Sequence, residues 1–244
     1  MFCRTCRGPA GDGFARCYQC ELALREAGGL LADVVVPVGY AVRGGALAED
    51  LRRYKSDRVD AAQAAAAAGR LGAMLAAFLA EYGAGVWAAA GMRGGPAAVA
   101  VVPSGQGRPG THPLGTLVRS GLDLPLVPLA VRPGEVHGRG VNADWVRVGG
   151  RVTGADLLVA DDTWVSGGSA QSVAAALKRA GAGRVAVVVL GRHVNAADPR
   201  SETFLRALSP GASPLRQSDE TMTAAREGDC RAVRLADLHQ AGDR

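Results

Sequence analysis

Short apolar runs alternate with longer stretches of helical periodicity along most of the chain. Strands are predicted where the apolar run is short, at residues 33–43, 97–102, 124–130, 144–148, 156–160 and 184–190. Helices are predicted at residues 45–55, 57–82, 114–120 and 169–182. Strands that alternate with helices predict an α/β fold, in which helices cover both faces of a mostly parallel sheet.

The longest helical pattern, at residues 57–82, is predicted to contribute to the core. Four large apolar residues recur there at helical spacing: Leu71, Leu75, Phe78 and Leu79. Asp57 is predicted as the N-cap, because its carboxylate can accept hydrogen bonds from free backbone N–H groups. Gly83 is predicted to end the helix.

The apolar run at residues 157–160 ends in two adjacent carboxylates, Asp161 and Asp162. Open α/β sheets bind ligands at the carboxyl ends of their strands, so this pair is predicted to face a ligand. A turn of small and hydroxyl-bearing residues then leads into a helix: Val165, Ser166, Gly167, Gly168 and Ser169. Free N–H groups and the positive end of the helix dipole favour a phosphate there. The alternative is an ordinary strand, turn and helix with an acidic N-cap.

Four of the five cysteines lie within the first twenty residues, as two CxxC pairs separated by ten residues: Cys3, Cys6, Cys17 and Cys20. This spacing predicts one structural Zn²⁺ held by four thiolates, and it leaves no open position for a catalytic water. Two disulfides or a redox CxxC are the alternatives. The fifth cysteine, Cys230, is interpreted as a small buried hydrophobic residue.

The composition fits one α/β core with a small appendage, since 48% of the 244 residues are apolar. We expect a cysteine module at 1–27, a connecting segment with the long helix at 28–95, and the main core with a C-terminal tail at 96–244. No run reaches eighteen uninterrupted apolar residues, and the first twenty residues contain no secretory h-region. The sequence therefore predicts a cytoplasmic protein without a membrane span.

The formal charge of +5 favours anionic partners, such as phosphorylated metabolites or nucleic acid. Basic residues gather around Tyr54 in the segment LRRYKSDR at residues 51–58. A DNA-binding surface usually has a denser basic stripe, so the charge supports only non-specific contact with DNA. The segment equally fits the basic last turn of an exposed helix.

Residues 156–169, DLLVADDTWVSGGS, resemble the phosphoribosyl pyrophosphate (PRPP) motif of type I phosphoribosyltransferases. The resemblance implies that Asp161 and Asp162 bind the ribose hydroxyls. It also implies that the turn from Val165 to Ser169 holds the 5′-phosphate. Val165 departs from the motif, because a hydroxyl-bearing residue is common at that position.

Together with the cysteine module and the basic segment, this motif resembles the ComF family of competence-associated phosphoribosyltransferase-like proteins. The resemblance implies a type I phosphoribosyltransferase fold and a part in nucleotide salvage or in DNA handling during uptake, with DNA or a DNA-handling protein as a partner. Family members often carry an RGFNQ-like segment after the strand at 97–102. This chain has PSGQGRPGTHPLG there, which lacks the Asn and Gln.

Two further loops acquire expected roles from the resemblance. The loop at residues 103–108 follows a strand, so Ser104, Gly105 and Arg108 are expected to contact the pyrophosphate of PRPP. The loop at residues 131–142 stands where a mobile loop closes over PRPP in these enzymes. Its candidates for contacts on closure are Arg132, His137 and Arg139. A plain glycine-rich connection and a surface loop are the respective alternatives.

The function that follows is Mg²⁺-dependent transfer of phosphoribosyl from PRPP to a nitrogenous, nucleobase-like acceptor, with Asp161 and Asp162 as the catalytic pair. The segment at residues 51–57 and the C-terminal tail are expected to cover the site. The alternative is a weakly active or inactive protein that binds PRPP or a nucleotide as a sensor or an adaptor.

Overall fold

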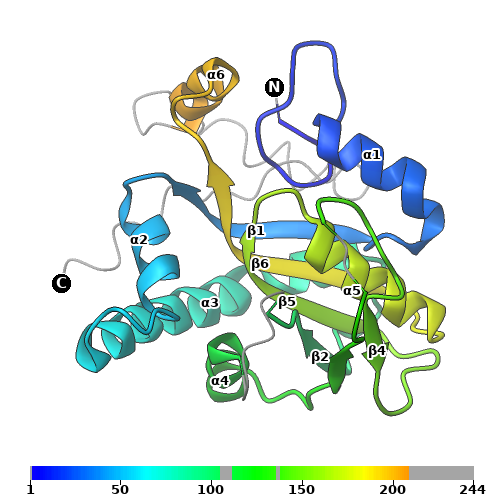
Figure 1. The fold of residues 1–244 in the computed structure, drawn as a ribbon. Helices are drawn as coiled ribbons and strands as arrows, with labels where there is room; N and C mark the ends of the chain where they lie inside the picture. Colours follow the sequence, from blue (N-terminus) through cyan, green and yellow to red (C-terminus); the bar gives the residue numbers. More distant parts are fainter. Residues whose placement is uncertain (1, 105–111, 136–137, 209–244) are drawn as a thin grey trace.

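The computed structural model describes residues 2–104, 112–135 and 138–208 (Figure 1). Its helices are α1 (Tyr18–Ala27), the 3-10 helix η1 (Gly28–Leu30), α2 (Ala46–Arg53), α3 (Ala61–Ala89), α4 (Pro113–Gly121), α5 (Gly168–Arg179) and α6 (Pro199–Leu208). Its strands are β1 (Val34–Val42), β2 (Ala98–Val101), β3 (Leu129–Val131), β4 (Val146–Val148), β5 (Leu157–Trp164) and β6 (Val185–Val194).

Four strands form the central sheet, in the order β1-β6-β5-β2, and every neighbouring pair is parallel. The inner strands β5 and β6 are largely buried, because helices cover both of their faces. Pro37 lies in β1, which is an edge strand and can accommodate a residue without a backbone N–H.

Helices cover both faces of this sheet (Figure 1), which confirms the predicted fold class. The helices α2, α3 and α4 pack on one face around a buried cluster that includes Leu71, Phe78 and Leu158. The helix α5 packs on the other face, next to α1, around a cluster that includes Val159 and Val187. This second cluster also contains cysteines of the N-terminal segment.

The predicted strand at 124–130 is only partly correct. The strand β3 covers Leu129–Val131 and pairs antiparallel with β4 in a separate two-stranded sheet, while Leu126 alone bridges Val99 of β2. Pro125 and Pro128 explain the difference, because proline lacks the N–H that a continuous strand needs.

The predicted bounds of the long helix are wrong at both ends. The N-cap of α3 is Asp60, whose carboxylate accepts hydrogen bonds from the N–H groups of Ala62 and Gln63 at 2.6 and 3.4 Å. At the other end the helix passes through Gly83 to Ala89. Gly83 is buried close to the Trp87 ring, and we attribute the tolerance of a glycine there to this packing.

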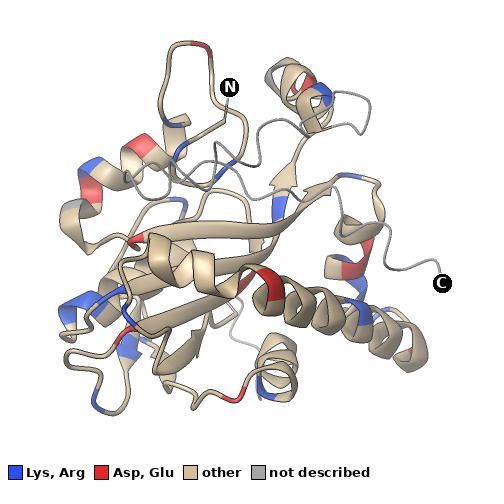
Figure 2. Ribbon diagram, turned by 180° about the vertical axis from the view of Figure 1, so that it is seen from behind, with Lys and Arg blue, Asp and Glu red and all other residues tan. Residues whose placement is uncertain are grey.

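Within the described residues, α3 is the one helix whose length and composition would allow it to cross a membrane, with a mean hydropathy of 1.3 over its most apolar window. The core helix of a globular protein meets the same criterion, so the helix does not by itself indicate a span. Its large side chains Leu71, Leu75 and Phe78 pack into the core as predicted, and Leu79 is half-buried. The outer surface is mainly alanine and glycine, and α3 carries few charges (Figure 2).

Candidate functional site

The sheet has a topological switch point between β2 and β5. These neighbouring strands are parallel, but the chain leaves β2 toward α4 on one face and leaves β5 toward α5 on the other face. In open α/β sheets, the place where connections diverge in this way is the crevice at the carboxyl ends of the two strands, and ligands bind there. The candidate site therefore lies between the residues that follow Val101 and the end of β5.

The two predicted carboxylates lie within β5, which is longer than expected. Pairing with β2 ends at Ala160, whereas pairing with β6 continues to Trp164. We call this extension, residues 161–164, the β5 overhang. Because side chains alternate along a strand, Asp161 is directed to the α5 side of the sheet and Asp162 to the side of α2, α3 and α4.

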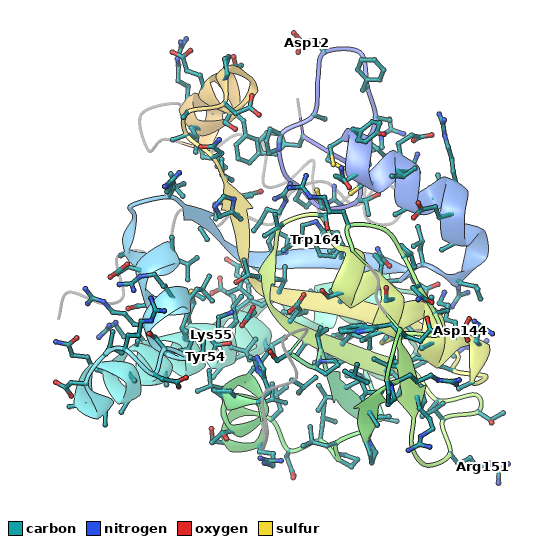
Figure 3. All side chains as sticks on the ribbon, in the orientation of Figure 1. Asp12, Tyr54, Lys55, Asp144, Arg151 and Trp164 are labelled. Carbon is teal, nitrogen blue, oxygen red and sulfur yellow. The ribbon has the colours of Figure 1, made fainter. Side chains whose placement is uncertain are left out.

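Asp162 is buried and is held by the residues that follow α2. Its Oδ2 accepts a hydrogen bond from the Tyr54 hydroxyl, and the Lys55 ammonium lies 2.6 Å from the same oxygen. Figure 3 shows Tyr54 and Lys55 together, where α2 and α3 meet the end of the sheet. The segment at 51–57 thus covers one side of the candidate site.

Two glycines allow α2 to approach the sheet closely enough for this contact. A Cβ atom on Gly39 would lie 2.6 Å from the Leu47 side chain, and one on Gly191 would lie 2.4 Å from the Leu51 side chain. Leucines of α2 therefore occupy space that any larger residue in β1 or β6 would fill. The helix then ends just before Tyr54 and Lys55.

The environments of the two carboxyls shift their pKa values in opposite directions. Desolvation and the neighbouring Asp162 charge raise the pKa of Asp161 to about 7. Burial also raises the pKa of Asp162, but the Lys55 ammonium and the hydrogen bonds from Lys55 and Tyr54 outweigh burial and lower it. Near neutral pH the pair therefore combines an ionised Asp162 with an Asp161 that is partly protonated.

The turn after β5 has the form expected of an anion-binding helix start. Gly167 is the N-cap of α5 and adopts a left-handed φ of 88°, and a Cβ atom there would lie 2.2 Å from the Trp164 ring. The Ser166 hydroxyl accepts a hydrogen bond from the N–H of Gly168 at 3.3 Å. Val165 is 56% exposed and Ser169 lies in the first turn of α5. No carboxylate caps this helix, so the alternative of an acidic N-cap is wrong.

The loop predicted to close over PRPP lies against the start of α5. A Cβ atom on Gly168 would lie 2.7 Å from the Gly140 carbonyl oxygen and 3.1 Å from backbone atoms of Arg139. The following N–H groups donate to side chains of two helices: that of Val141 to Glu26 at 3.1 Å and that of Asn142 to Ser172 at 2.9 Å. The structure thus brings exposed Arg139 beside the turn. Arg132 is exposed at the end of β3, and His137 lies outside the described residues.

The predicted pyrophosphate loop is described only at its beginning. Ser104 follows β2 at the crevice, whereas Gly105 and Arg108 lie outside the described residues. Beyond the undescribed stretch, His112 caps α4, and its Nδ1 accepts a hydrogen bond from the N–H of Leu114 at 3.2 Å. His112 is also an electrostatic neighbour of Asp162, so α4 begins near the acidic pair.

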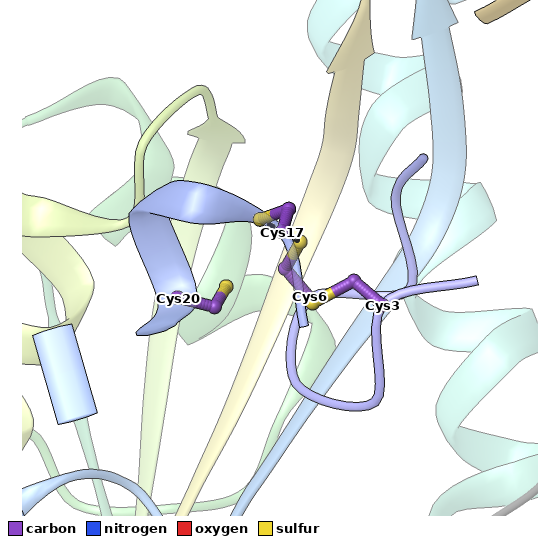
Figure 4. A group of neighbouring side chains, drawn as sticks. All are labelled: Cys3, Cys6, Cys17 and Cys20. Carbon is purple, nitrogen blue, oxygen red and sulfur yellow. Dashed lines mark hydrogen bonds between the residues drawn. The ribbon is translucent and has the colours of Figure 1, made fainter. Parts of the chain in front are cut away.

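The four N-terminal cysteines come together as a candidate metal centre (Figure 4). All four are free thiols, and their Sγ atoms lie within 4.8 Å of one another. The Sγ atoms of Cys6 and Cys17 are 3.8 Å apart, which matches the edge of a tetrahedron with metal–sulfur bonds of about 2.3 Å. Hydrogen bonding, first from Cys17, lowers the pKa of Cys6 to about 7, with a smaller contribution from the Arg192 charge. The set fits a structural metal ion such as zinc.

Sequence reasoning expected the segment at residues 51–57 to cover the site, but it did not predict the contacts of Tyr54 and Lys55 with Asp162, and it missed Arg192 altogether. Arg192 is buried near the end of β6, beside the cysteines and the end of β5. The sequence does contain a signal for Arg192, because Gly191, Arg192 and His193 follow a run of six apolar residues in the same strand.

No protein-family model matches the chain, and no curated protein matches it. Among solved structures, the chain is similar to orotate phosphoribosyltransferase of Mycobacterium tuberculosis H37Rv in complex with 5-phospho-α-D-ribosyl 1-diphosphate (PRPP). The identity is 20%, the match covers 61% of this chain and 86% of that chain, and the TM-score is 0.33. We draw no conclusion from a likeness of this size.

Proposed function

We propose that this protein is a ComF-like member of the type I phosphoribosyltransferases and that its switch-point crevice binds PRPP. The observation that carries the proposal is the β5 overhang, which presents Asp161 and Asp162 immediately before a left-handed glycine turn and the start of α5. Carboxylates that can accept hydrogen bonds from two ribose hydroxyls therefore lie next to a helix N-terminus that can bind a phosphate. A phosphorylated ribose requires both.

In this proposal the turn binds the 5′-phosphate through backbone N–H groups of residues 166–169, with the N–H of Gly168 exchanging the Ser166 hydroxyl for a phosphate oxygen. A side chain on Gly168 would collide with the backbone of the 131–142 loop, so glycine keeps the helix start close to that loop. The hydroxyls of Ser166 and Ser169 add side-chain donors. Val165 contributes only its backbone N–H, so phosphate binding here depends more on the main chain than in the family motif.

The acidic pair binds the ribose hydroxyls and stabilises positive charge on the ring. Loss of pyrophosphate from C1 gives the ribose oxocarbenium character, and carboxylates fixed nearby lower the energy of that state. Mg²⁺, which prefers oxygen ligands, would neutralise the departing pyrophosphate when it is bound with PRPP. Lys55 and Tyr54 keep Asp162 ionised and oriented, and a nitrogenous acceptor completes the transfer.

The proposal is tested by calorimetric titration of the protein with PRPP and Mg²⁺, with ribose 5-phosphate and a nucleoside monophosphate as comparisons. We expect binding that requires both pyrophosphate and Mg²⁺, and its loss in the double variant D161N/D162N. D144N is the control, because Asp144 is exposed and pairs with Arg179 at a distance of 3.1 Å. Unchanged PRPP affinity in the double variant would reject the proposal.

A second candidate function, a PRPP or nucleotide sensor or adaptor, is favoured by one contact. The Lys55 ammonium already occupies Asp162 Oδ2, so a ligand hydroxyl must share or displace it. Release of pyrophosphate from PRPP in the presence of candidate nitrogenous bases separates the two functions. Release indicates a transferase, whereas binding without release indicates a sensor.

A further inference from the structure

Arg192 is the most unusual charged residue in the described part of the chain. Its side chain is 92% buried by area, since only 8% remains exposed, and among the described residues no carboxylate pairs with it. Its Nε is buried without a hydrogen-bond partner in the same part of the chain. A buried cation is costly unless an opposite charge lies nearby, so a counter-charge is expected.

The cysteine cluster lies beside this guanidinium and would supply that counter-charge when it holds a metal ion. The guanidinium lies against Gly8, where an added Cβ atom would be 2.7 Å from Nε and 2.8 Å from Nη2. Gly8 belongs to the first cysteine turn, because its carbonyl accepts a hydrogen bond from the N–H of Cys3 at 2.8 Å. A Zn²⁺ ion held by four thiolates carries net negative charge, which a guanidinium at this position would balance.

On its other side the same guanidinium holds the end of β5. Its Nη1 donates hydrogen bonds to the carbonyls of Trp164 at 3.1 Å and His193 at 2.6 Å. Trp164, labelled in Figure 3, is buried. Its ring fills the space that a side chain on Gly167, the N-cap of α5, would need. One side chain therefore connects the cysteine cluster to the residue that supports the turn after β5.

We propose that Arg192 is a positioning residue that couples the metal state of the cysteine cluster to the anion-binding turn at residues 165–168. With metal bound, the charge of the cluster fixes the guanidinium, and the guanidinium fixes the Trp164 carbonyl and the indole beneath Gly167. Without metal, the guanidinium loses its counter-charge and the turn loosens. The consequence for ligand affinity rests on the proposed function, whereas the loosening of the turn does not.

The test is hydrogen exchange of the full-length protein with zinc bound and after zinc removal by a chelator. We expect the amides of residues 166–169 to exchange faster after zinc removal, on the order of tenfold, while amides in the middle of β6 stay protected. In R192Q these amides should exchange fast with zinc bound and respond no further to its removal. R192K keeps the charge without the planar fork, so it should retain part of the response.

Two controls separate positioning from general damage. R184Q removes an arginine that immediately precedes β6 and pairs with Asp33 at 3.1 Å, so it should keep the response to zinc removal. G8A keeps the charge but displaces the guanidinium, so it should reproduce the effect of R192Q. G29A is its match, because no heavy atom of the described residues other than its chain neighbours lies within 4 Å of the added methyl group, and it should behave as wild type.

Titration with ribose 5-phosphate gives a second readout. The wild-type affinity should fall about tenfold after zinc removal, and the affinity of R192Q should already be low and insensitive to zinc. A purified protein without zinc, or a turn whose exchange ignores zinc removal, would overturn the coupling. If the turn responds but no phosphoribosyl ligand binds, the coupling stands and the proposed function fails.

Discussion

At the scale of single residues, the most informative observation is that the pKa of Asp161 is raised while the pKa of Asp162 is lowered. Both are carboxylates in one strand, yet Asp162 has a hydroxyl and an ammonium as partners. Asp161 Oδ1 accepts a hydrogen bond from the N–H of Asp162 at 2.8 Å and lies beside the Asp162 charge. Asp161 is therefore the carboxyl whose protonation state depends on pH near neutrality.

This difference predicts a pH-dependent cost of Asp161 to folding. Its pKa is about 7 in the folded protein and near 3.8 as an unperturbed side chain, so the folded state binds more protons between these values. Stability is accordingly lost as the pH rises from about 4 to about 7. D161N removes this pH-dependent loss of stability. The variant should therefore have a higher melting temperature than wild type at pH 8, and the difference should shrink toward pH 4.

Thermal unfolding of both proteins at several pH values measures this difference. D162N is the matched comparison. It should lower the melting temperature at pH 8, because it removes the partner of the Lys55 ammonium. An identical pH profile for wild type and D161N would contradict the pKa assignment.

At the scale of elements, the N-cap of α3 is Asp60 in the structure, whereas the sequence analysis predicted Asp57. D60A should lower the free energy of unfolding by about 1 kcal/mol, because two N–H groups of the first turn lose their acceptor. D57A should have almost no effect, because Asp57 is exposed and precedes the helix. Urea unfolding of the two variants measures the difference, and equal losses would show that Asp57 shares the capping role.

Most elements could be predicted because their signals are local. The apolar runs of β1, β5 and β6 and the periodicity of α3 and α5 appear within a few residues of sequence. The length of β5 could not be predicted, because charged residues normally end an apolar strand. Asp161 and Asp162 remain in the strand because β6 continues to pair with them. The strand predicted at 124–130 is mostly absent although its residues are apolar, because the run contains two prolines.

The candidate site could be predicted in part. The acidic pair and the glycine turn are adjacent in sequence, so the motif places them together without knowledge of the fold. The contacts of Asp162 with Tyr54 and Lys55 span more than 100 residues and depend on how closely α2 packs on two glycines. No local pattern encodes such a contact. The same is true of Arg192, whose neighbours come from the N-terminus and from β5.

At the scale of the whole molecule, the cysteine segment belongs to the core. Cys3, Cys6 and Cys20 are buried in the cluster that also contains residues of α5 and of the central sheet. A separate module at residues 1–27 remains a prediction. Because the cysteines share this cluster, a bound metal ion should stabilise the neighbouring core as well as the loops that hold it.

Removal of zinc should therefore loosen the first 27 residues and lower the melting temperature while the central strands remain folded. Trypsin is a suitable probe, because Arg4, Arg7 and Arg16 lie between or beside the cysteines. Cleavage at these arginines should accelerate with a chelator but not with a reductant alone, since the four thiols are free. A cleavage pattern that responds only to the reductant would indicate disulfides.

The β5 overhang has a further consequence for the behaviour of the protein in solution. Among the described residues, no strand pairs with the β2 side of β5 beyond Ala160, so backbone groups on that side form an edge to which a strand of another molecule could pair. Charged side chains are a common defence against such pairing. Asp161 and Asp162 therefore also oppose aggregation at a place where an inner strand of the sheet becomes an edge.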